Sequence, residues 1–426
     1  MEKQAAIILG AGITGLSAGI ASQREIYEAQ DIAGGICASY YIGADGRKSF
    51  SAPGTDAYRF ELGGGHWIFG GDPAVTAVIG RYTRLQRYER KSAVYFPGMD
   101  RYVPYPIQNH LYYLPSQIRD NALRDILRSE GGPASTLAEW LESNFGRTLC
   151  ELFFFPFHAL YTANLYTQIA PQDQFKSPVD KDLIMQGAEQ PTPAIGYNAT
   201  FAYPERGMDD LIRQMAQQCA VHFNKKLVRL AVADKDAFFD DGSAVRYAKM
   251  ISTAPLNKLL ELAGLSVGTA APYTSVLVFN IGARKGRRCP ADHWLYIPAS
   301  KSGFHRVGFY SNVDRSFVPS RAEDRVSIYV EKAYPGGQKP TAAEIDAVGN
   351  STIAELQAWG FIDAVDVIDP TWIDVAYTWE YPRSPWKQKA IELLAQHDIR
   401  VTGRYGAWRF QGIMDSVRDG LAIANG

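Results

Sequence analysis

The residues near the start of the chain that are best suited to chemistry are three glycines and one acid. Gly10, Gly12 and Gly15 form a GxGxxG pattern directly after the apolar residues 5–9, and Glu28 ends the later segment REIYE. The glycines allow a sharp bend, a close approach of backbone to a pyrophosphate, and tight helix–strand packing. An acid after the second strand can accept hydrogen bonds from a ribose. This order predicts a site for the ADP half of a dinucleotide, with an ordinary glycine-rich turn as the alternative.

A second glycine pair, Gly34 and Gly35, lies shortly after Glu28 in the segment EAQDIAGGICAS. The interval from Gly10 to Glu28 is a few residues short of the usual ~20, which predicts a helix about one turn shorter. The second pair would let the backbone pass close to the rest of a long cofactor. A nicotinamide enzyme does not need this extension, so the sequence favours FAD.

The composition is that of a globular protein of two or three interleaved domains. The 426 residues are 46% hydrophobic and 21% charged, with a formal net charge of -1, which gives no reason to expect a nucleic-acid partner. The four cysteines form no CxxC pair, so we expect neither a metal site nor a disulfide framework. No apolar run approaches the roughly 18 residues of a membrane span. We therefore expect a cytoplasmic protein that binds a small molecule, with its oligomeric state left open.

The rest of the chain must form the helices and strands that position this site. Between about residues 110 and 190, segments such as DNALRDILRSE, STLAEWLESNFG and LCELFFFPFHALY predict helices. The segments TSVLVFN, HRVGFY and VSIYVE predict an antiparallel sheet. MISTAP and IRVTGRYG are typical of strands that return to the nucleotide domain, and the final GIMDSVRDGLAIANG predicts a helix.

We therefore predict an α/β fold with three parts. A discontinuous Rossmann-like FAD-binding domain would comprise residues 1–75, 201–270 and 385–426. Residues 76–200 would form a mainly helical insertion, and residues 271–384 a β-rich domain that carries the substrate.

Ordered motifs over nearly the whole chain resemble those of the UDP-galactopyranose mutases, especially the eukaryotic-type branch, within the flavin amine-oxidase superfamily. The motifs are GAGITGL, EAQDIAGGICAS, GGGHWIF, YVPYPIQN, YNATFAYPERG, ISTAP, HWLYIP, FHRVGFYSN and GRYGAWRFQGIMDS. The resemblance implies FAD as the cofactor, a nucleotide sugar as the substrate and a role in carbohydrate biosynthesis.

The resemblance also implies which residues hold the flavin. The matching positions are Gly10, Gly12, Gly15, Glu28, Gly34, Gly35, His66, Arg404 and Asp415. A helix that begins after Asp415 could direct its N-terminus at the electron-rich edge of the flavin, where developing negative charge is stabilised. From the residues alone, His66 is an ordinary histidine in a tight loop.

For the nucleotide sugar, the resemblance implies an aromatic pocket with an arginine and paired tyrosines. The matching positions are Gln108, Asn198, Trp294, Tyr296, Arg306 and Tyr381. Arg306, Tyr296 and Tyr381 would act on the phosphate in catalysis, while His66 and Arg404 would support the flavin and the sugar. Arginine can clamp two phosphate oxygens, although from the residues alone an arginine in a sheet is more often a surface or salt-bridged residue.

Several positions depart from the family pattern. A second diphosphate arginine is replaced in the segment that contains Lys176, a uracil-stacking tryptophan falls near Thr162, and a late tyrosine falls at Phe410. The Gly-Gly-His loop has an extra glycine, and Glu61 stands where an aspartate is usual. These departures predict an intact flavin site and a substrate other than UDP-galactose.

The resemblance implies that reduced FAD acts as a nucleophile through its N5 atom on a nucleotide-activated sugar or another glycosyl substrate. The alternative is a redox flavoenzyme, such as an amine oxidase or a sugar or alcohol oxidase, which takes a hydride from its substrate. A flavin-binding protein that has lost its catalytic function is a third possibility.

Overall fold

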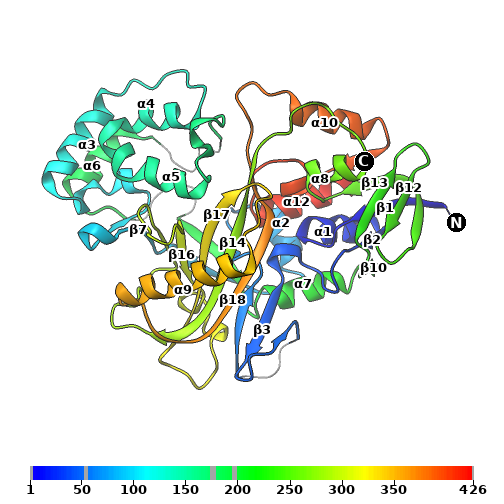
Figure 1. The fold of residues 1–426 in the computed structure, drawn as a ribbon, viewed down its shortest axis with the longest axis horizontal. Coiled ribbons are helices and arrows are strands. Elements are labelled where there is room, and N and C mark those ends of the chain that lie inside the picture. The colour runs from blue at the N-terminus through cyan, green and yellow to red at the C-terminus, as the bar shows by residue number, and fades with distance from the viewer. Residues whose placement is uncertain (1–2, 52–55, 173–178, 194–198, 425–426) are drawn as a thin grey trace.

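The computed structural model describes residues 3–51, 56–172, 179–193 and 199–424 (Figure 1). Its first sheet has the strand order β10-β2-β1-β13-β12-β11, and β19 pairs with β13. The strands are β1 (Lys3–Leu9), β2 (Glu25–Tyr27), β10 (Val221–His222), β11 (Leu227–Ala231), β12 (Asp236–Phe239), β13 (Ala244–Ser252) and β19 (Ile399–Val401). The pairs that join β10, β2, β1, β13 and β19 are parallel, while β11 and β12 extend the sheet antiparallel.

Both faces of this sheet are covered, which explains the unbroken apolar run in β1. Ile8 packs with the cluster of α1, α7 and α12, whereas Ile7 and Leu9 pack with the cluster of α8 and α10. The helices are α1 (Ile13–Ser22), α7 (Met208–Ala216), α8 (Leu256–Leu262), α10 (Trp386–Ala395) and α12 (Ile413–Ala424). Successive side chains of a strand point to opposite faces, so a strand buried on both sides is apolar throughout.

The second sheet has the order β18-β14-β17-β16-β15-β7-β8. Its strands are β7 (Ser92–Phe96), β8 (Arg101–Pro104), β14 (Tyr273–Lys285), β15 (Trp294–Tyr296), β16 (Arg306–Phe309), β17 (Arg325–Pro335) and β18 (Ile362–Thr378). All of these pairs are antiparallel except β15 with β7, which is parallel. The helix α9 (Ala342–Ala358) packs against β18.

The helical part comprises α3 (Ser116–Arg128), α4 (Leu137–Leu149), a π-helical turn (Cys150–Phe154), α5 (Phe155–Tyr161) and α6 (Lys181–Glu189). Phe153, Phe154 and Phe157 are buried in its core, so the aromatic run serves mainly to pack these helices together. Figure 1 shows these helices at the opposite end of the molecule from β1, β2 and β13, with β14 and β17 between them. The stretch expected as a helical insertion also contains strands. Residues 92–104, with the fully buried strand SAVYF, join the second sheet as β7 and β8, and residues 85–89 form a further strand.

Smaller elements complete the fold. They are β3 (Ser39–Gly43), β4 (Lys48–Ser49) and β5 (Ala57–Glu61) in one sheet, β6 (Leu85–Glu89) with β9 (Thr200–Pro204) in another, and the helices α2 (Pro73–Ile79) and α11 (Gly403–Gly406). Within the described parts of the chain, no helix combines the length and the apolar character needed to cross a bilayer.

Candidate functional site

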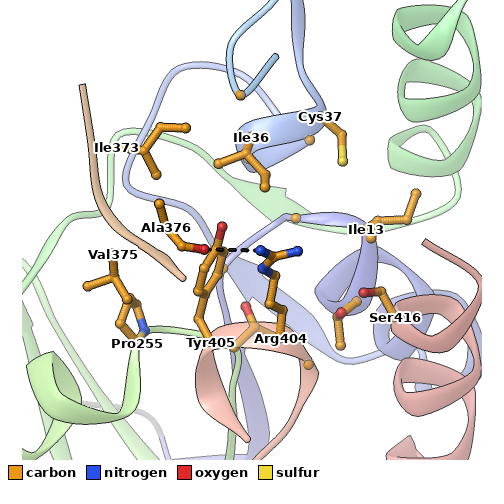
Figure 2. Close-up of a pocket in the computed structure, with 18 of the residues that line it drawn as sticks. Ile13, Ile36, Cys37, Pro255, Ile373, Val375, Ala376, Arg404, Tyr405 and Ser416 are labelled. Carbon is orange, nitrogen blue, oxygen red and sulfur yellow. Dashed lines mark hydrogen bonds between the residues drawn. The ribbon is translucent and has the colours of Figure 1, made fainter. Parts of the chain in front are cut away.

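A cavity of about 600 Å³ runs between the carboxyl ends of β1 and β2 and the second sheet. The two glycine-rich segments, the loop around His66, and α11 with the start of α12 form its walls. Figure 2 shows Ile13 and Cys37 of the two glycine-rich segments, Arg404 of α11 and Ser416 of α12 around one space. Ligands of parallel α/β sheets bind at this place, where the strands end and the connecting loops diverge.

The first glycine-rich turn has the conformation that its pattern predicts. Gly10 has a φ of 92°, and a Cβ on Gly15 would lie 1.9 Å from the Gly10 carbonyl oxygen. At Gly12, no atom lies within 4 Å of the place where a Cβ would stand. The first and third glycines therefore shape the turn, while the second leaves open space in front of the backbone.

The second glycine pair lies directly beside the first turn. The Gly34 amide donates a hydrogen bond of 2.8 Å to the Ala11 carbonyl, and Gly12 and Gly34 form an isolated parallel bridge. Gly34 and Gly35 have φ values of 111° and 56°, in the region that glycine adopts most easily. The two segments thus form one continuous backbone wall.

Glu28 and the N-terminus of α1 complete this end of the cavity. The Glu28 carboxylate accepts hydrogen bonds from the amides of Ala11 (2.6 Å) and Gln30 (2.9 Å). Burial raises the pKa of Glu28, although these amides act against the rise. No side chain caps α1 at Gly12, so its first amides remain available to an anion.

These residues fit the ADP half of FAD. A diphosphate requires open space beside backbone amides, which Gly12 and the uncapped α1 provide, and a ribose requires an acceptor such as Glu28. The second glycine pair extends the wall toward the second sheet, as a cofactor longer than a nicotinamide dinucleotide would need.

Arg404 projects from α11 into the cavity beyond this wall. Its guanidinium donates to the carbonyls of Ala376 (3.1 Å, dashed in Figure 2) and Gln411 (3.3 Å). It also lies 4.7 Å from the Phe410 ring centroid and 5.1 Å from that of Tyr377. In the described parts of the chain no carboxylate pairs with Arg404, so its positive charge can serve a bound anion.

His66 is held by a buried acid. Glu61 is fully buried and accepts from the His66 amide at 2.8 Å, and one of its oxygens lies 3.1 Å from His66 Nδ1. Tyr203 donates to the other Glu61 oxygen at 2.7 Å. Burial alone would lower the pKa of His66, but the neighbouring Cys37 and Glu61 raise it to about 10. His66 is therefore a cation in the cavity wall near neutral pH.

Arg306 is paired with an acid that also lines the cavity. Its guanidinium donates to both oxygens of Glu331, at 2.5 and 2.6 Å, and to the Tyr377 hydroxyl at 3.3 Å. Burial would raise the pKa of Glu331, but Arg306 and His305 bring it down to about 2. The positive charge of Arg306 is thus largely neutralised by Glu331.

The structure places the predicted residues in two groups. The residues that line the cavity are Gly10, Gly12, Glu28, Gly34, Gly35, His66, Arg306 and Arg404. The residues that lie outside this lining are Gly15, Gln108, Trp294, Tyr296, Tyr381 and Asp415. Asn198 and Lys176 fall outside the residues that the structure describes. The binding and catalytic roles expected of these residues stay predictions.

Some residues of the second group contact the first. Gly15 packs on Gly10, and Asp415 accepts a hydrogen bond of 3.2 Å from Gly412, which lines the cavity. Tyr296 is the cross-strand partner of Arg306. Tyr381 follows β18 in a turn, and it is Tyr377, within β18, that reaches Arg306.

Sequence reasoning missed Glu331, Tyr377 and Cys37 as cavity residues. Glu331 ends the segment VSIYVE, which the sequence assigned to a strand, but only the register between strands shows that it faces Arg306. Tyr377 lay in no segment that the sequence assigned to a strand, and it reaches Arg306 from β18. Cys37 directly follows the second glycine pair, and that position was its only signal.

We expect Glu61→Gln to lower the pKa of His66 from its value near 10, because the variant loses the carboxylate that stabilises the imidazolium. A folded-state pKa above the usual 6.5 stabilises the folded protein below pH 6.5, and this contribution is lost as the pH rises toward 10. NMR of ¹³C-histidine would follow the ring, with Asp45→Asn as an exposed control. An unchanged titration in Glu61→Gln would contradict the assignment.

Comparisons with known proteins agree with this geometry. The family model described as flavin containing amine oxidoreductase matches residues 9–285. The structure is similar to reduced UDP-galactopyranose mutase, with a TM-score of 0.84 and 24% identity over 99% of this chain and 95% of that one.

Two further solved structures share the fold. A protein from Exiguobacterium sp. 255-15, to which a protoporphyrinogen oxidase activity is ascribed, has a TM-score of 0.73 and 14% identity, covering 100% of this chain and 98% of that one. A putrescine oxidase double mutant has a TM-score of 0.58 and 14% identity, covering 99% and 98%. The family match spans more than half of the chain and its residues form a site that fits the cofactor, so the chain belongs to the flavin-containing amine oxidoreductase family and is an FAD-dependent enzyme.

Proposed function

We propose that this enzyme acts on a glycosyl group carried by a nucleoside diphosphate, with a substrate site altered from that for UDP-galactose. The observation that carries the proposal is the likeness of the whole chain to UDP-galactopyranose mutase, with a TM-score of 0.84 against 0.58 for putrescine oxidase. The resemblance of ordered motifs over the same length supports it independently of the fold.

The charge of the cavity favours anionic groups, which include the diphosphate of FAD itself. Among the described residues of its lining, five are lysines or arginines and two are acids. The lining cations are Lys225, Lys226, Lys258, Arg306 and Arg404, and the acids are Glu28 and Glu331. A cleft with an excess of one charge attracts ligands of the other sign.

Bound FAD supplies a ring that can exchange electrons or act as a nucleophile. Residues of the protein supply positive charge to the cavity. The Arg404 guanidinium has no carboxylate partner among the described residues, and His66 is a second cation in the cavity wall. Arg306 and Tyr377 offer fixed hydrogen-bonding groups at the inner end of the cavity, where β16 and β18 of the second sheet line it. Such an arrangement can position a sugar and stabilise a departing phosphate without a proton-transfer pair.

The alternative is an oxidoreductase that takes a hydride from an amine or alcohol, and the family to which the chain belongs supports it. A carboxylate would bind an ammonium substrate strongly, and Glu331 is the acid of the cavity lining on the side of the second sheet. Glu331 is already bound by Arg306 through both oxygens, which leaves it a poor partner for a second cation. We therefore favour the glycosyl substrate.

The test is to reduce the purified flavoprotein anaerobically and supply a panel of UDP-, GDP-, ADP- and dTDP-sugars. We expect one of them to yield an isomer of the same mass, with no net oxidation. Oxidised enzyme incubated with amines, alcohols and free sugars is the second arm. Bleaching of the flavin by one of these compounds without added reductant, together with no isomer in the first arm, would establish the oxidase alternative instead.

A further inference from the structure

Cys37, His66 and Glu61 form a cluster at the wall of the cofactor cavity. Cys37 ends the short turn that follows the second glycine pair, and both Cys37 and His66 line the cavity. A side-chain hydrogen bond joins Cys37 to His66. Glu61 accepts from the His66 amide at 2.8 Å and lies 3.1 Å from Nδ1, so it orients the ring. A thiol, an imidazole and an orienting carboxylate are the parts of an activated nucleophile.

The backbone brings the His66 ring to the turn that carries Cys37. The Gly63 amide donates to the Ile36 carbonyl at 2.9 Å. A Cβ on Gly63 would lie 2.7 Å from His66 Cε1 and 2.8 Å from the Ile36 Cβ. The His66 ring and the residue before Cys37 therefore close on one point, which only a glycine leaves free. The contact between the thiol and the imidazole is thus built into the packing of two loops.

Cys37 differs from the other cysteines of the chain in having this cation beside it. Burial raises the pKa of Cys219 and that of Cys289 to about 11, and it also raises the pKa of Cys150. Such thiols stay protonated and unreactive near pH 7. His66 is a cation at that pH, and a thiol beside a cation ionises more readily than a thiol buried without one.

The cavity gives a small molecule access to the Cys37 sulfur. Cys37 is only 5% exposed, but it lines the cavity of about 600 Å³, and Figure 2 shows its sulfur directed toward the space between Ile13 and Arg404. The positive charges of Arg404 and His66 favour an anionic reagent there. A small electrophile can therefore reach Cys37 in the cofactor-free protein, whereas FAD bound in the same cavity would cover it.

We propose that Cys37 is a modification site: a peroxide that enters the cofactor-free cavity oxidises its sulfur, and the modified protein no longer binds FAD. The Cys37 thiolate attacks one oxygen of hydrogen peroxide, an S–O bond forms as the O–O bond breaks, and the sulfur becomes a sulfenic acid. The departing hydroxide takes the proton of the His66 imidazolium and leaves as water. The sulfur is thereby oxidised and the peroxide reduced.

The added oxygen would occupy part of the space that FAD needs. The Cys37 amide donates to the Gly34 carbonyl at 3.1 Å, which fixes the residue on its turn, and the open side of the residue is the cavity. An excess of a small thiol would return the sulfenic acid to the thiol through a mixed disulfide. Such a site exists whichever substrate the enzyme takes.

Alkylation by iodoacetamide at pH 7, followed at each cysteine by peptide mass spectrometry, tests the reactivity. In the cofactor-free protein we expect Cys37 to be labelled about tenfold faster than Cys219 and Cys289, or more, and FAD should protect it. Rates are taken relative to the fully buried Cys150, so equal labelling of all the cysteines would count against the proposal. Labelling of Cys37 that is no faster than that of Cys219, or that FAD does not slow, would also overturn it.

His66→Gln tests whether the imidazolium activates the thiol. We expect this variant to slow the labelling of Cys37 by about tenfold and to lower the preference of Cys37 for anionic iodoacetate over neutral iodoacetamide, which a loss of packing alone would not change. His222→Gln is the matched control, because His222 Nε2 also lies 3.2 Å from a glutamate, Glu25, but His222 is exposed and outside the cavity lining. An unchanged preference in His66→Gln would contradict the activation.

The affinity for FAD before and after brief treatment with hydrogen peroxide tests the consequence. We expect the treated wild type to bind FAD about tenfold to a hundredfold more weakly, the effect of one extra group in a packed site, and dithiothreitol to restore the affinity. Cys37→Ala should show no change on treatment, whereas Cys219→Ala should respond as the wild type does. A peroxide effect that persists in Cys37→Ala would overturn the proposal and leave the proposed function untouched, since no substrate takes part.

Discussion

Replacing Glu331 by alanine should destabilise the folded protein by about 2 kcal/mol, because it leaves the half-buried Arg306 guanidinium without its acid. Glu331 is 2% exposed and also contacts His305, so its removal leaves two basic side chains without their acid. The free energy of unfolding, from urea denaturation at pH 7, measures the effect.

The double variant Glu331→Ala, Arg306→Met is the control, since it removes both charges and should recover part of the loss. A double variant less stable than Glu331→Ala would contradict the pairing. The pH dependence has a definite sign: the pKa of Glu331 is lowered from 4.5 to about 2. Its contribution is therefore present above pH 4.5 and is lost as the pH falls toward 2.

Substitutions at two glycines of the nucleotide turn should separate cofactor binding from folding. Gly12→Val should lower the affinity for FAD by about a hundredfold or more, yet leave the apoprotein stable, because its φ of -67° suits any residue and the side chain enters open space. Gly15→Val should lower both affinity and stability, because its Cβ would overlap the Gly10 carbonyl.

Flavin fluorescence on titration with FAD and urea denaturation of the apoprotein measure the two quantities separately. Gly98→Ala is a control, since Gly98 lies outside the cavity lining and nothing lies within 4 Å of its Cβ position. Full FAD affinity in Gly12→Val would show that the open space is not where the diphosphate binds.

The nucleotide end of the site could be predicted from the sequence because it is local. Gly10, Gly12 and Gly15 lie within one turn, and their roles follow from backbone geometry that few other residues allow. The later segments around residues 250 and 400 were also recognisable, because a short apolar run before a helix is typical of a parallel strand.

The inner end of the site could not be predicted from the residues alone. Arg306 and Glu331 are 25 positions apart, and they meet only because β16 and β17 pair in the register that sets them opposite each other. Tyr377 and Tyr381 are equally plausible in the sequence, and only the end of β18 before Tyr381 separates them. Register and strand ends depend on the packing of the whole sheet, which local patterns do not report.

The closing of the first sheet by β19, α11 and α12 has a consequence for biosynthesis. The strand at Ile399–Val401 pairs with β13, and Gly420 of α12 packs so closely on α1 that a Cβ there would lie 2.3 Å from the Thr14 carbonyl. Arg404 and Gly403 of the cavity wall belong to the same late segment. A nascent chain therefore has a complete cofactor pocket only after Ser416, the last residue of its lining, leaves the ribosome, so we expect FAD to be captured after these elements are synthesised rather than during synthesis of the glycine-rich turn.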